Sequence, residues 1–320
     1  MRLSTSMIYQ QNMNGILNGQ SAWQKAGEQL ASGTKVSVPS DDPIAASQSI
    51  MIDQAQAETS QYALARTFSR QNMSLELTAL DSIVVAVTSA STAVISAGGV
   101  KSNDDRNTQA EVLEGIKAQL LNIANMTDGN GNYIFAGFQT TTEPYVQDAT
   151  TKAVSYVGGH TAISQQVDSN RSMAVSSTGP QVFDSVTGDA IKSPDGTIQK
   201  DLFEALDISI KALRTPIDDG DTAALQALQT ALDTTNSGLR NSLNNVSSVQ
   251  SMLGIQLNEL DQLDAIGADR KLANAQAKSA LVDTDWVPAI STYIMQQASL
   301  QAAYTTYQNM QGLSLFQINK

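Results

Sequence analysis

The polar clusters that could do chemistry in this 320-residue sequence are short acidic loops. Asp128, Asn130 and Asn132 have the spacing with which a calcium-binding loop begins, because alternate oxygen-bearing side chains can face one ion. Such a loop also needs glycine at its sixth position and glutamate at its twelfth, and this chain has Tyr133 and Gln139 there. We therefore interpret the segment as a turn and predict no metal site.

The other candidate clusters have simpler explanations as helix starts and turns. Asp41 and Asp42 could be a pair of catalytic carboxylates, but an acidic residue followed by Pro43 is also how many helices begin. Residues 218–221 (Asp-Asp-Gly-Asp) have the composition of a turn followed by a helix cap. Residues 98–102 lack the glycine spacing of a phosphate-binding loop. We predict no catalytic residue and no cofactor.

Composition excludes several classes of partner and site. The net charge of -12 disfavours binding to nucleic acids and to anionic membranes. The absence of cysteine rules out disulfides and thiolate metal sites, and the single histidine, His160, lies in a glycine-rich turn. We find no apolar run near the roughly 18 residues of a membrane helix, and no cleaved signal peptide. The protein is expected either to stay in the cytoplasm or to leave it without cleavage.

The two ends of the chain have helical apolar patterns and almost no charge. Residues 286–320 contain no charged side chain before Lys320, and residues 1–33 contain only Arg2, Lys25 and Glu28. Surface helices normally carry charge on the solvated face, so both helices suit packing against other protein. Apolar residues spaced three and four apart predict a coiled-coil seam. The residues expected to form the pair and its assembly surfaces are Met13, Ile16, Trp23, Leu30, Ile290, Tyr293, Leu300, Tyr304 and Tyr307.

The middle of the chain has long helical patterns on both sides of a region rich in glycine and short β-prone runs. Helices are expected at 44–97, from 103 to about 123, at 201–214, and from 221 to about 267. In the first, apolar residues recur at every seventh position from Met73 to Val94, and in the last, Leu or Val does so from Leu225 to Leu260. The β-prone runs are 133–136, 153–157, 163–167, 173–175 and 182–183.

This symmetric order predicts a mainly α fold, a long antiparallel helical bundle or coiled-coil rod with its terminal helices paired and a small β-rich insert at its centre. Residues 1–40 with 281–320 are expected to form a terminal coiled coil. Residues 41–132 with 200–280 would form a helical rod domain, and 133–199 an outer β-rich domain.

Several segments resemble the flagellin-like family of bacterial flagellar proteins. Residues 30–33 (Leu-Ala-Ser-Gly) and 39–46 (Pro-Ser-Asp-Asp-Pro-Ile-Ala-Ala) are similar to the N-terminal signature of flagellins and hook-associated proteins, and 283–316 to the C-terminal region. The segments 131–137, 144–145 and 179–183 are similar to the hook-associated protein 3 family. The matching motif residues are Ser32, Gly33, Asp41, Asp42, Pro43, Tyr133, Phe135 and Gly137.

The resemblance implies a structural subunit of the flagellum and not an enzyme. It implies export without a cleaved signal peptide, through the flagellar type III channel, with a chaperone that binds the C-terminal region. Outside the cell, identical subunits would form a zone at the hook–filament junction, beside the other hook-associated junction protein and flagellin, and would be needed for filament attachment and motility. No nucleic acid, membrane or small-molecule partner is implied.

Two alternatives stay open at this point. The chain could be a flagellin, since only the central motifs argue otherwise. It could also be a secreted enzyme or effector with a catalytic β-rich insert, although the acids of that insert are scattered: Asp148, Asp168, Asp184 and Asp189. In either flagellar reading, the terminal helices have too little apolar area to offset their ordering entropy, so we predict that they are mobile in the monomer and fold on assembly.

Overall fold

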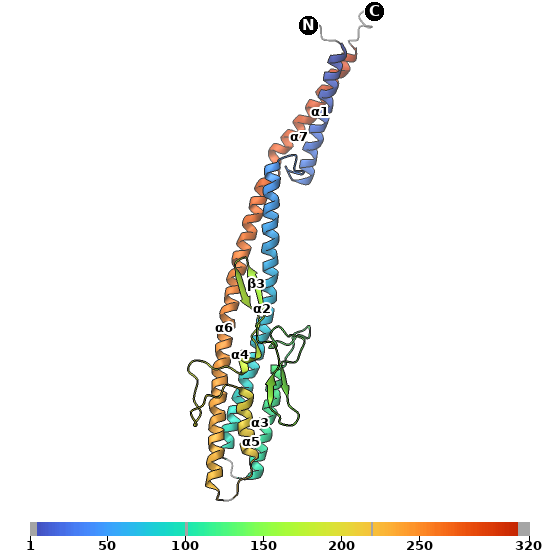
Figure 1. Cartoon of the computed structure of the whole chain (residues 1–320). Helices are drawn as coiled ribbons and strands as arrows, with labels where there is room; N and C mark the ends of the chain where they lie inside the picture. The colour runs from blue at the N-terminus through green and yellow to red at the C-terminus, as the bar shows by residue number, and fades with distance from the viewer. Residues whose placement is uncertain (1–4, 100–101, 219, 313–320) are drawn as a thin grey trace, which may run out of the picture. The chain divides into compact units, whose positions relative to one another are not determined.

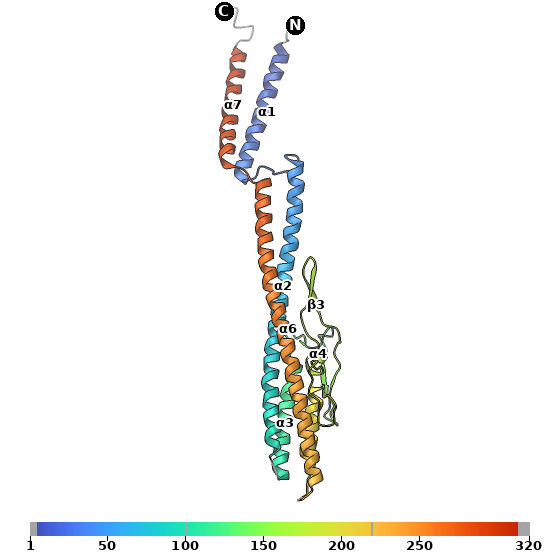
Figure 2. The ribbon, with the colours of Figure 1, turned by 90° about the vertical axis from the view of Figure 1, so that its left-hand side faces the viewer.

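The computed structural model describes residues 5–99, 102–218 and 220–312, and these are mainly helical, with two short β-hairpins (Figures 1 and 2). The helices are α1 (Thr5–Ser32), α2 (Pro43–Ala97), α3 (Asn103–Ala124), α4 (Gly179–Phe183), α5 (Leu202–Arg214), α6 (Thr222–Val282) and α7 (Trp286–Gly312). Strands β1 (Tyr145–Gln147) and β2 (Val154–Tyr156) form one antiparallel hairpin, and β3 (Ser164–Asp168) and β4 (Arg171–Ala174) form the other. The predicted fold class is confirmed.

The chain divides into two compact units. Residues 1–59 with 268–320 form one, called here the terminal unit, and residues 60–267 form the other, the central unit. The finer division into three domains remains a prediction.

In the terminal unit, α1 packs along α7 (Figure 1). The first part of α2 pairs with the last part of α6, where Lys278 Nζ lies 2.6 Å from Asp53 Oδ1 and Asn274 Nδ2 donates to Gln56 Oε1 at 3.5 Å. The predicted pairing of the terminal helices is therefore present within one chain.

The central unit has a continuous apolar core between α2, α3, α5 and α6. Helices α2 and α6 are antiparallel. Gln250 donates to Asp81 at 2.8 Å, and Ser91, further along α2, donates to the earlier α6 residue Asn236 at 3.3 Å. The heptad positions of both helices are buried, as the periodicity predicted, except Leu225, which is 44% exposed near the start of α6. The buried heptad residues are Met73, Leu80, Val87, Val94, Leu232, Leu239, Val246, Leu253 and Leu260.

The two acidic residues interpreted as helix caps, Asp42 and Asp221, do cap helices, and Asp201 is a further cap. Asp42 Oδ1 accepts from the amides of Ile44 and Ala45 at 3.0 Å each, which fixes the start of α2. Asp201 and Asp221 act in the same way at α5 and α6, where each carboxylate accepts amide hydrogen bonds of the first turn.

Two expectations for the insert were wrong. Residues 133–136 form no strand; Tyr133 makes only an isolated bridge with Thr127. The run 182–183 lies in α4, where Pro180 stands in the first turn and the Gln181 side chain accepts from the Thr178 amide at 3.0 Å. These N-terminal capping features favour a helical turn over the strand that Val182 and Phe183 suggested.

The expected end of α6 near Gly267 was also wrong, since the helix continues to Val282. Gly267 is buried, and a Cβ atom there would lie 2.7 Å from Arg66 Nη2. The glycine thus makes room for a guanidinium group from α2, while the surrounding helix overrides its low helical propensity.

Helix α2 is long and apolar enough, by length and composition alone, to cross a membrane, so the expectation that no segment would qualify was wrong. Its apolar character has a simpler source in the fold. Leu80, Ile83, Val87 and Val94 belong to the same core cluster as residues of α3, α5 and α6.

Candidate functional site

The seam between α1 and α7 contains aromatic contacts and close approaches of large α7 side chains to glycines of α1. The Trp23 and Tyr293 rings lie 5.8 Å apart, centre to centre. A Cβ atom on Gly19 would lie 3.5 Å from Leu300 Cδ1, and one on Gly27 would lie 3.4 Å from Tyr293 Cε2. Glycine therefore lets the larger side chains of α7 approach the α1 backbone.

The predicted assembly residues fall into two groups. Those in or beside the seam are buried (Ile16) or half-buried (Trp23, Leu30, Tyr293, Leu300 and Tyr307), and the Tyr307 ring lies 6.0 Å from that of Tyr9. Those that remain exposed are Met13, Ile290 and Tyr304, with 41%, 47% and 44% of their surface accessible. The second group leaves apolar surface available outside the helix pair.

Further large apolar residues of the terminal helices are exposed, and the sequence reasoning did not single them out. Val287 is 77% exposed, and the others are Met7, Leu17, Trp286, Ile294 and Met295. Helix α7 has no charged residue over Trp286–Gly312. The absence of charge on every face of this helix was the available sequence signal, because such a helix suits packing against protein on more than one face.

The Ser32-Gly33 motif forms the junction at the end of α1. Gly33 has a φ of 72°, the left-handed conformation in which many helices end, and its amide still donates to Gln29 O at 3.0 Å. Its carbonyl accepts from the Thr284 amide at 2.9 Å, and Thr34 forms an antiparallel bridge with Asp283. The motif thus joins the loop after α1 to the loop before α7.

The acidic part of the same motif organises the loop between α1 and α2. Asp41 Oδ1 lies 2.7 Å from Lys25 Nζ, and Oδ2 accepts from the Ser37 and Val38 amides. These interactions, the Lys25 contact first, lower the pKa of the Asp41 carboxyl. Asp41 shapes the loop while Asp42 caps α2, so this pair of carboxylates is structural.

The two central motifs, far apart in sequence, meet in the central unit. The Gly179 amide donates to Phe135 O at 2.9 Å, and the Phe135 and Phe183 rings lie 5.6 Å apart, edge to face. Gly137 has a φ of 58°, and a Cβ atom on it would lie 2.5 Å from Gly159 O. Gly137 therefore permits both an unusual backbone conformation and a close backbone approach.

An aromatic cluster extends this contact to the helices. Tyr145 from β1 packs on Phe183 of α4 and on Phe203 of α5, with ring centres 5.2 and 5.4 Å away. Its hydroxyl donates to Asp184 Oδ2 at 3.4 Å. Burial, and then the charge of Asp184, raise the pKa of the Tyr145 phenol far above its ordinary value, so Tyr145 stays protonated. The cluster fixes the insert on the helices of the central unit.

Each hairpin is held by a buried cation from a helix. Lys117 Nζ of α3 donates to Lys152 O, in the turn of the first hairpin, at 2.7 Å and to Asp207 Oδ1 of α5 at 2.5 Å. Arg66 of α2 donates to Val167 O, in β3, at 2.9 Å and to Asp264 Oδ1 of α6 at 2.5 Å. Sequence reasoning missed both cations, because a single Lys or Arg on a helix usually faces solvent.

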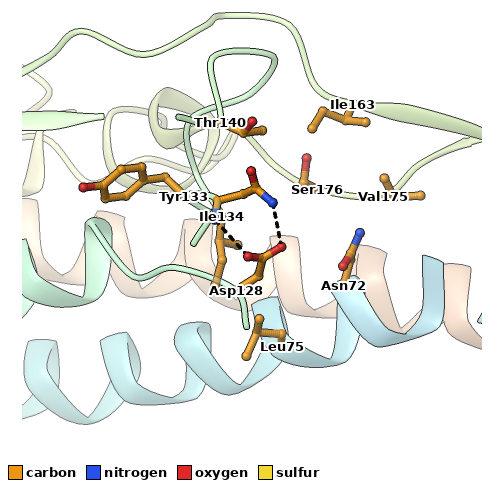
Figure 3. A pocket seen from close by; sticks show the side chains of 10 residues that line it. Asn72, Leu75, Asp128, Tyr133, Ile134, Thr140, Ile163, Val175 and Ser176 are labelled. Carbon is orange, nitrogen blue, oxygen red and sulfur yellow. Dashed lines mark hydrogen bonds between the residues drawn. The ribbon is translucent and has the colours of Figure 1, made fainter. Parts of the chain in front are cut away.

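The segment considered as a calcium loop is a turn beside a small cavity (Figure 3). Asp128 Oδ1 accepts from the Asn130 and Asn132 amides, and Oδ2 accepts from Asn132 Nδ2 at 3.1 Å. The carboxylate is therefore already occupied by donors of its own turn. The cavity of about 180 Å³ is lined by this turn, by Tyr133 and by Leu75 of α2. The described residues contain no group of three His, Asp or Glu placed to hold a metal ion.

Comparisons of this chain with known protein families, sequences and structures all find flagellar proteins. The bacterial flagellin N-terminal helical region matches residues 3–140. Proteins named flagellar hook-associated protein 3, from Escherichia coli (strain K12) and Salmonella typhimurium (strain LT2), are each 51% identical to this chain over 100% of both lengths. The flagellar junction protein FlgL from Legionella pneumophila has a similar structure, with a TM-score of 0.59 at 19% identity over 74% of this chain and 100% of that one. That structure supports the shared fold.

Proposed function

This chain belongs to the flagellar hook-associated protein 3 family, and we propose that it joins hook to filament through the uncharged outer surface of its α1–α7 pair. The protein is an extracellular structural component of the bacterial flagellum and not an enzyme. The observation that carries the proposal is the exposed apolar surface of two helices that have almost no charge.

The α1–α7 pair buries little on its own. In the described part of α1, only Ile16 and Ala26 are buried, and no described residue of α7 is. Ordering a residue costs about 1–2 kcal/mol of backbone entropy, which half-buried contacts offset poorly. We infer that neighbouring subunits complete the burial and that the pair becomes firmly ordered on assembly.

The absence of charge suits a partner that is another copy of the same chain. In a closely packed zone of identical subunits, every charge on these helices is repeated on each neighbouring copy, and the like charges would repel. An uncharged apolar surface avoids that repulsion, so a ring or helical zone of identical subunits can pack around these helices.

The same surface must also meet different proteins at the two borders of the zone. We propose the other hook-associated junction protein on one side and flagellin on the other. We propose export through the type III channel, with a chaperone binding the C-terminal region before assembly. The family motif residues at Ser32–Pro43 would then fix the loop that connects the assembly helices to α2.

A single substitution on the outer surface tests the proposal. Ile294→Asp places a charge on a residue of α7 that is 57% exposed and outside the aromatic seam. We expect a soluble, helical monomer that, produced in a strain lacking the gene, supports hooks but no attached filaments and no swimming. Electron microscopy of isolated flagella and motility in soft agar measure the two outcomes.

Val157→Asp is the matched control, because Val157 is also an exposed β-branched residue, 47% accessible, but lies in the insert. This variant should restore attachment. Normal attachment with Ile294→Asp would refute the role of the outer α7 surface. The gene deletion separates this function from that of a filament subunit: loss of a junction protein leaves intact flagellin shed into the medium, whereas loss of flagellin leaves none.

A further inference from the structure

The short helix α4 lies between a fully buried acidic residue, Glu76, and a half-buried one, Asp184. Before it, the amide of Ser177 donates to Glu76 Oε2 of α2 at 3.1 Å, and Glu76 is 0% exposed. After it, Asp184 accepts from the Tyr145 hydroxyl. Helix α4 is also held from α6, where Asn245 Nδ2 donates to Gln181 O at 2.8 Å and to Val182 O at 2.9 Å.

Neither acid has the donors that an ionised carboxylate needs. Glu76 Oε1 and Asp184 Oδ1 are buried without a hydrogen-bond partner among the described residues. An ionised carboxylate can accept about four hydrogen bonds, and burying one with fewer is costly, whereas a protonated acid needs fewer partners. The geometry therefore favours the protonated form of both groups.

The groups around the two acids add no compensating positive charge. Asp184 faces Tyr145 of β1, Tyr156 of β2 and the Asp201 carboxylate at the start of α5. Beyond Asp201, Asp207 is paired with Lys117, and the His160 ring lies 5.4 Å from the Tyr156 ring. Around Glu76, the polar contacts come from Ser177.

Burial raises the pKa of Glu76 to about 6. Burial first, and then the Asp201 charge, raise the pKa of Asp184 to about 7. Both values lie above the ordinary values of 4.5 and 3.8, so the folded protein binds protons more tightly than the unfolded chain does. The stabilisation from these groups is complete below about pH 4 and is lost as the pH rises through about 6 and 7.

We infer that Glu76 and Asp184 form a proton-dependent latch that holds α4, and with it the adjoining insert, on the helices of the central unit. With protons bound, the latch is closed. When both acids ionise, each must draw in water or leave its site, and α4 is the element that moves, because both acids contact its immediate flanks. The insert is thus held more firmly in mildly acidic solution than in alkaline solution.

Hydrogen exchange of the full-length chain tests this inference. Between pH 5.5 and pH 8, amides in peptides covering 177–184 should lose protection by roughly tenfold or more after correction for intrinsic exchange, since one pKa unit is a tenfold change in equilibrium. The variants Glu76→Gln and Asp184→Asn are neutral and of similar shape, so the double variant should show the same protection at both pH values. Glu111→Gln, an exposed position on α3, should keep the pH dependence of the parent.

Two results would overturn the latch: equal protection of α4 at both pH values in the parent protein, or an unchanged pH dependence in the double variant. A direct titration remains informative if the variants fold poorly. Carbon-13 NMR of the side-chain carboxyl groups should show midpoints well above those of exposed acids for Glu76 and Asp184. Midpoints in the ordinary range would refute the inference without any substitution.

Discussion

Replacing Lys117 by methionine tests whether a buried ion pair holds the first hairpin on the helices. The Lys117 side chain is 4% exposed, and its partner Asp207 is 35% exposed. Methionine has a similar volume and no charge, so Lys117→Met removes the ion pair and the bond to Lys152 O with little change in packing.

The loss in free energy of unfolding expected for Lys117→Met depends on how deeply Lys117 and Asp207 are buried. Removing one partner of a fully buried pair costs about 3–5 kcal/mol, because the remaining charge stays buried and unpaired. Asp207 is about a third exposed, so water screens part of that charge and the expected cost is smaller. Lys152 adds to it, because its φ of 59° is strained for a non-glycine residue and the Lys117 bond helps to hold it. We expect a loss of roughly 2–3 kcal/mol in the free energy of unfolding.

The same two helices provide a matched control. Arg214 of α5 lies 2.8 Å from Glu114 of α3, and these side chains are 52% and 44% exposed. An exposed pair contributes less than about 1 kcal/mol, so Arg214→Met should have a small effect. Adding Asp207→Leu to Lys117→Met removes the unpaired charge and should recover much of the lost stability.

Urea unfolding followed by far-ultraviolet circular dichroism measures these differences from the transition midpoints at constant slope. The reasoning would be refuted if Lys117→Met cost no more than Arg214→Met. A double variant that is less stable than Lys117→Met alone would also contradict it, because Asp207 would then stabilise the fold without its partner.

Three further substitutions and one protease experiment test other parts of the structure. Gly267→Ala should lower the free energy of unfolding by roughly 1–3 kcal/mol in urea, because the new Cβ displaces the tethered Arg66 guanidinium; an unchanged midpoint would contradict the packing described. Gly137→Ala should cost at least as much, since it adds left-handed strain and a contact with Gly159 O, and normal thermal stability would argue against it. Leu300→Asp, in the α1–α7 seam, should leave a helical monomer by circular dichroism that fails to join hook to filament; normal attachment would argue against the seam. Limited proteolysis of the monomer should remove both terminal helices first, and strong protection of both ends at low protein concentration would contradict their assembly-coupled folding.

Features set by local sequence could be predicted for this chain. The heptads of α2 and α6 gave the buried positions, because burial of one helical stripe requires apolar residues at that period. Asp42 and Asp221 marked helix starts, because a carboxylate before the first turn satisfies its free amides. Both kinds of signal depend only on residues within about two helical turns.

Features set by contacts between distant segments could not be predicted. Glycine at 267 is an ordinary helix-end signal, and only the Arg66 guanidinium beside it explains why a glycine stands inside a continuous helix. The strands and the helix α4 of the insert are only three to five residues long. Segments this short carry little propensity signal, so the sequence suggested a strand where α4 lies and did not indicate β1. Lys117 was indistinguishable in sequence from a solvated lysine, because its burial depends on α5 and a hairpin turn.

For the predicted assembly residues, the apolar spacing identified the α1–α7 seam but not the exposed surface outside it. The three-and-four spacing found Ile16, Trp23 and Leu30, which lie toward the seam, because periodicity reports the face that a helix presents to its nearest partner. Val287 and Met295 lie outside that stripe and are exposed. A single apolar stripe cannot indicate further contact faces on a helix, whereas the absence of charge around α7 is the feature that suits the additional contact faces proposed for it.

The two units use different interactions, and the difference fits their proposed roles. In the central unit, buried ionic and aromatic contacts with defined geometry hold the insert, so its position does not depend on neighbouring molecules. In the terminal unit, the α1–α7 seam has aromatic contacts and close approaches of large side chains to glycine, and the ion pair of Lys25 joins α1 to Asp41 in the adjoining loop. Apolar contacts are weakly directional and gain stability with each further area buried. A helix pair held in this way would be weak alone and would become strong when other subunits cover it, as the proposed export as a monomer followed by assembly requires.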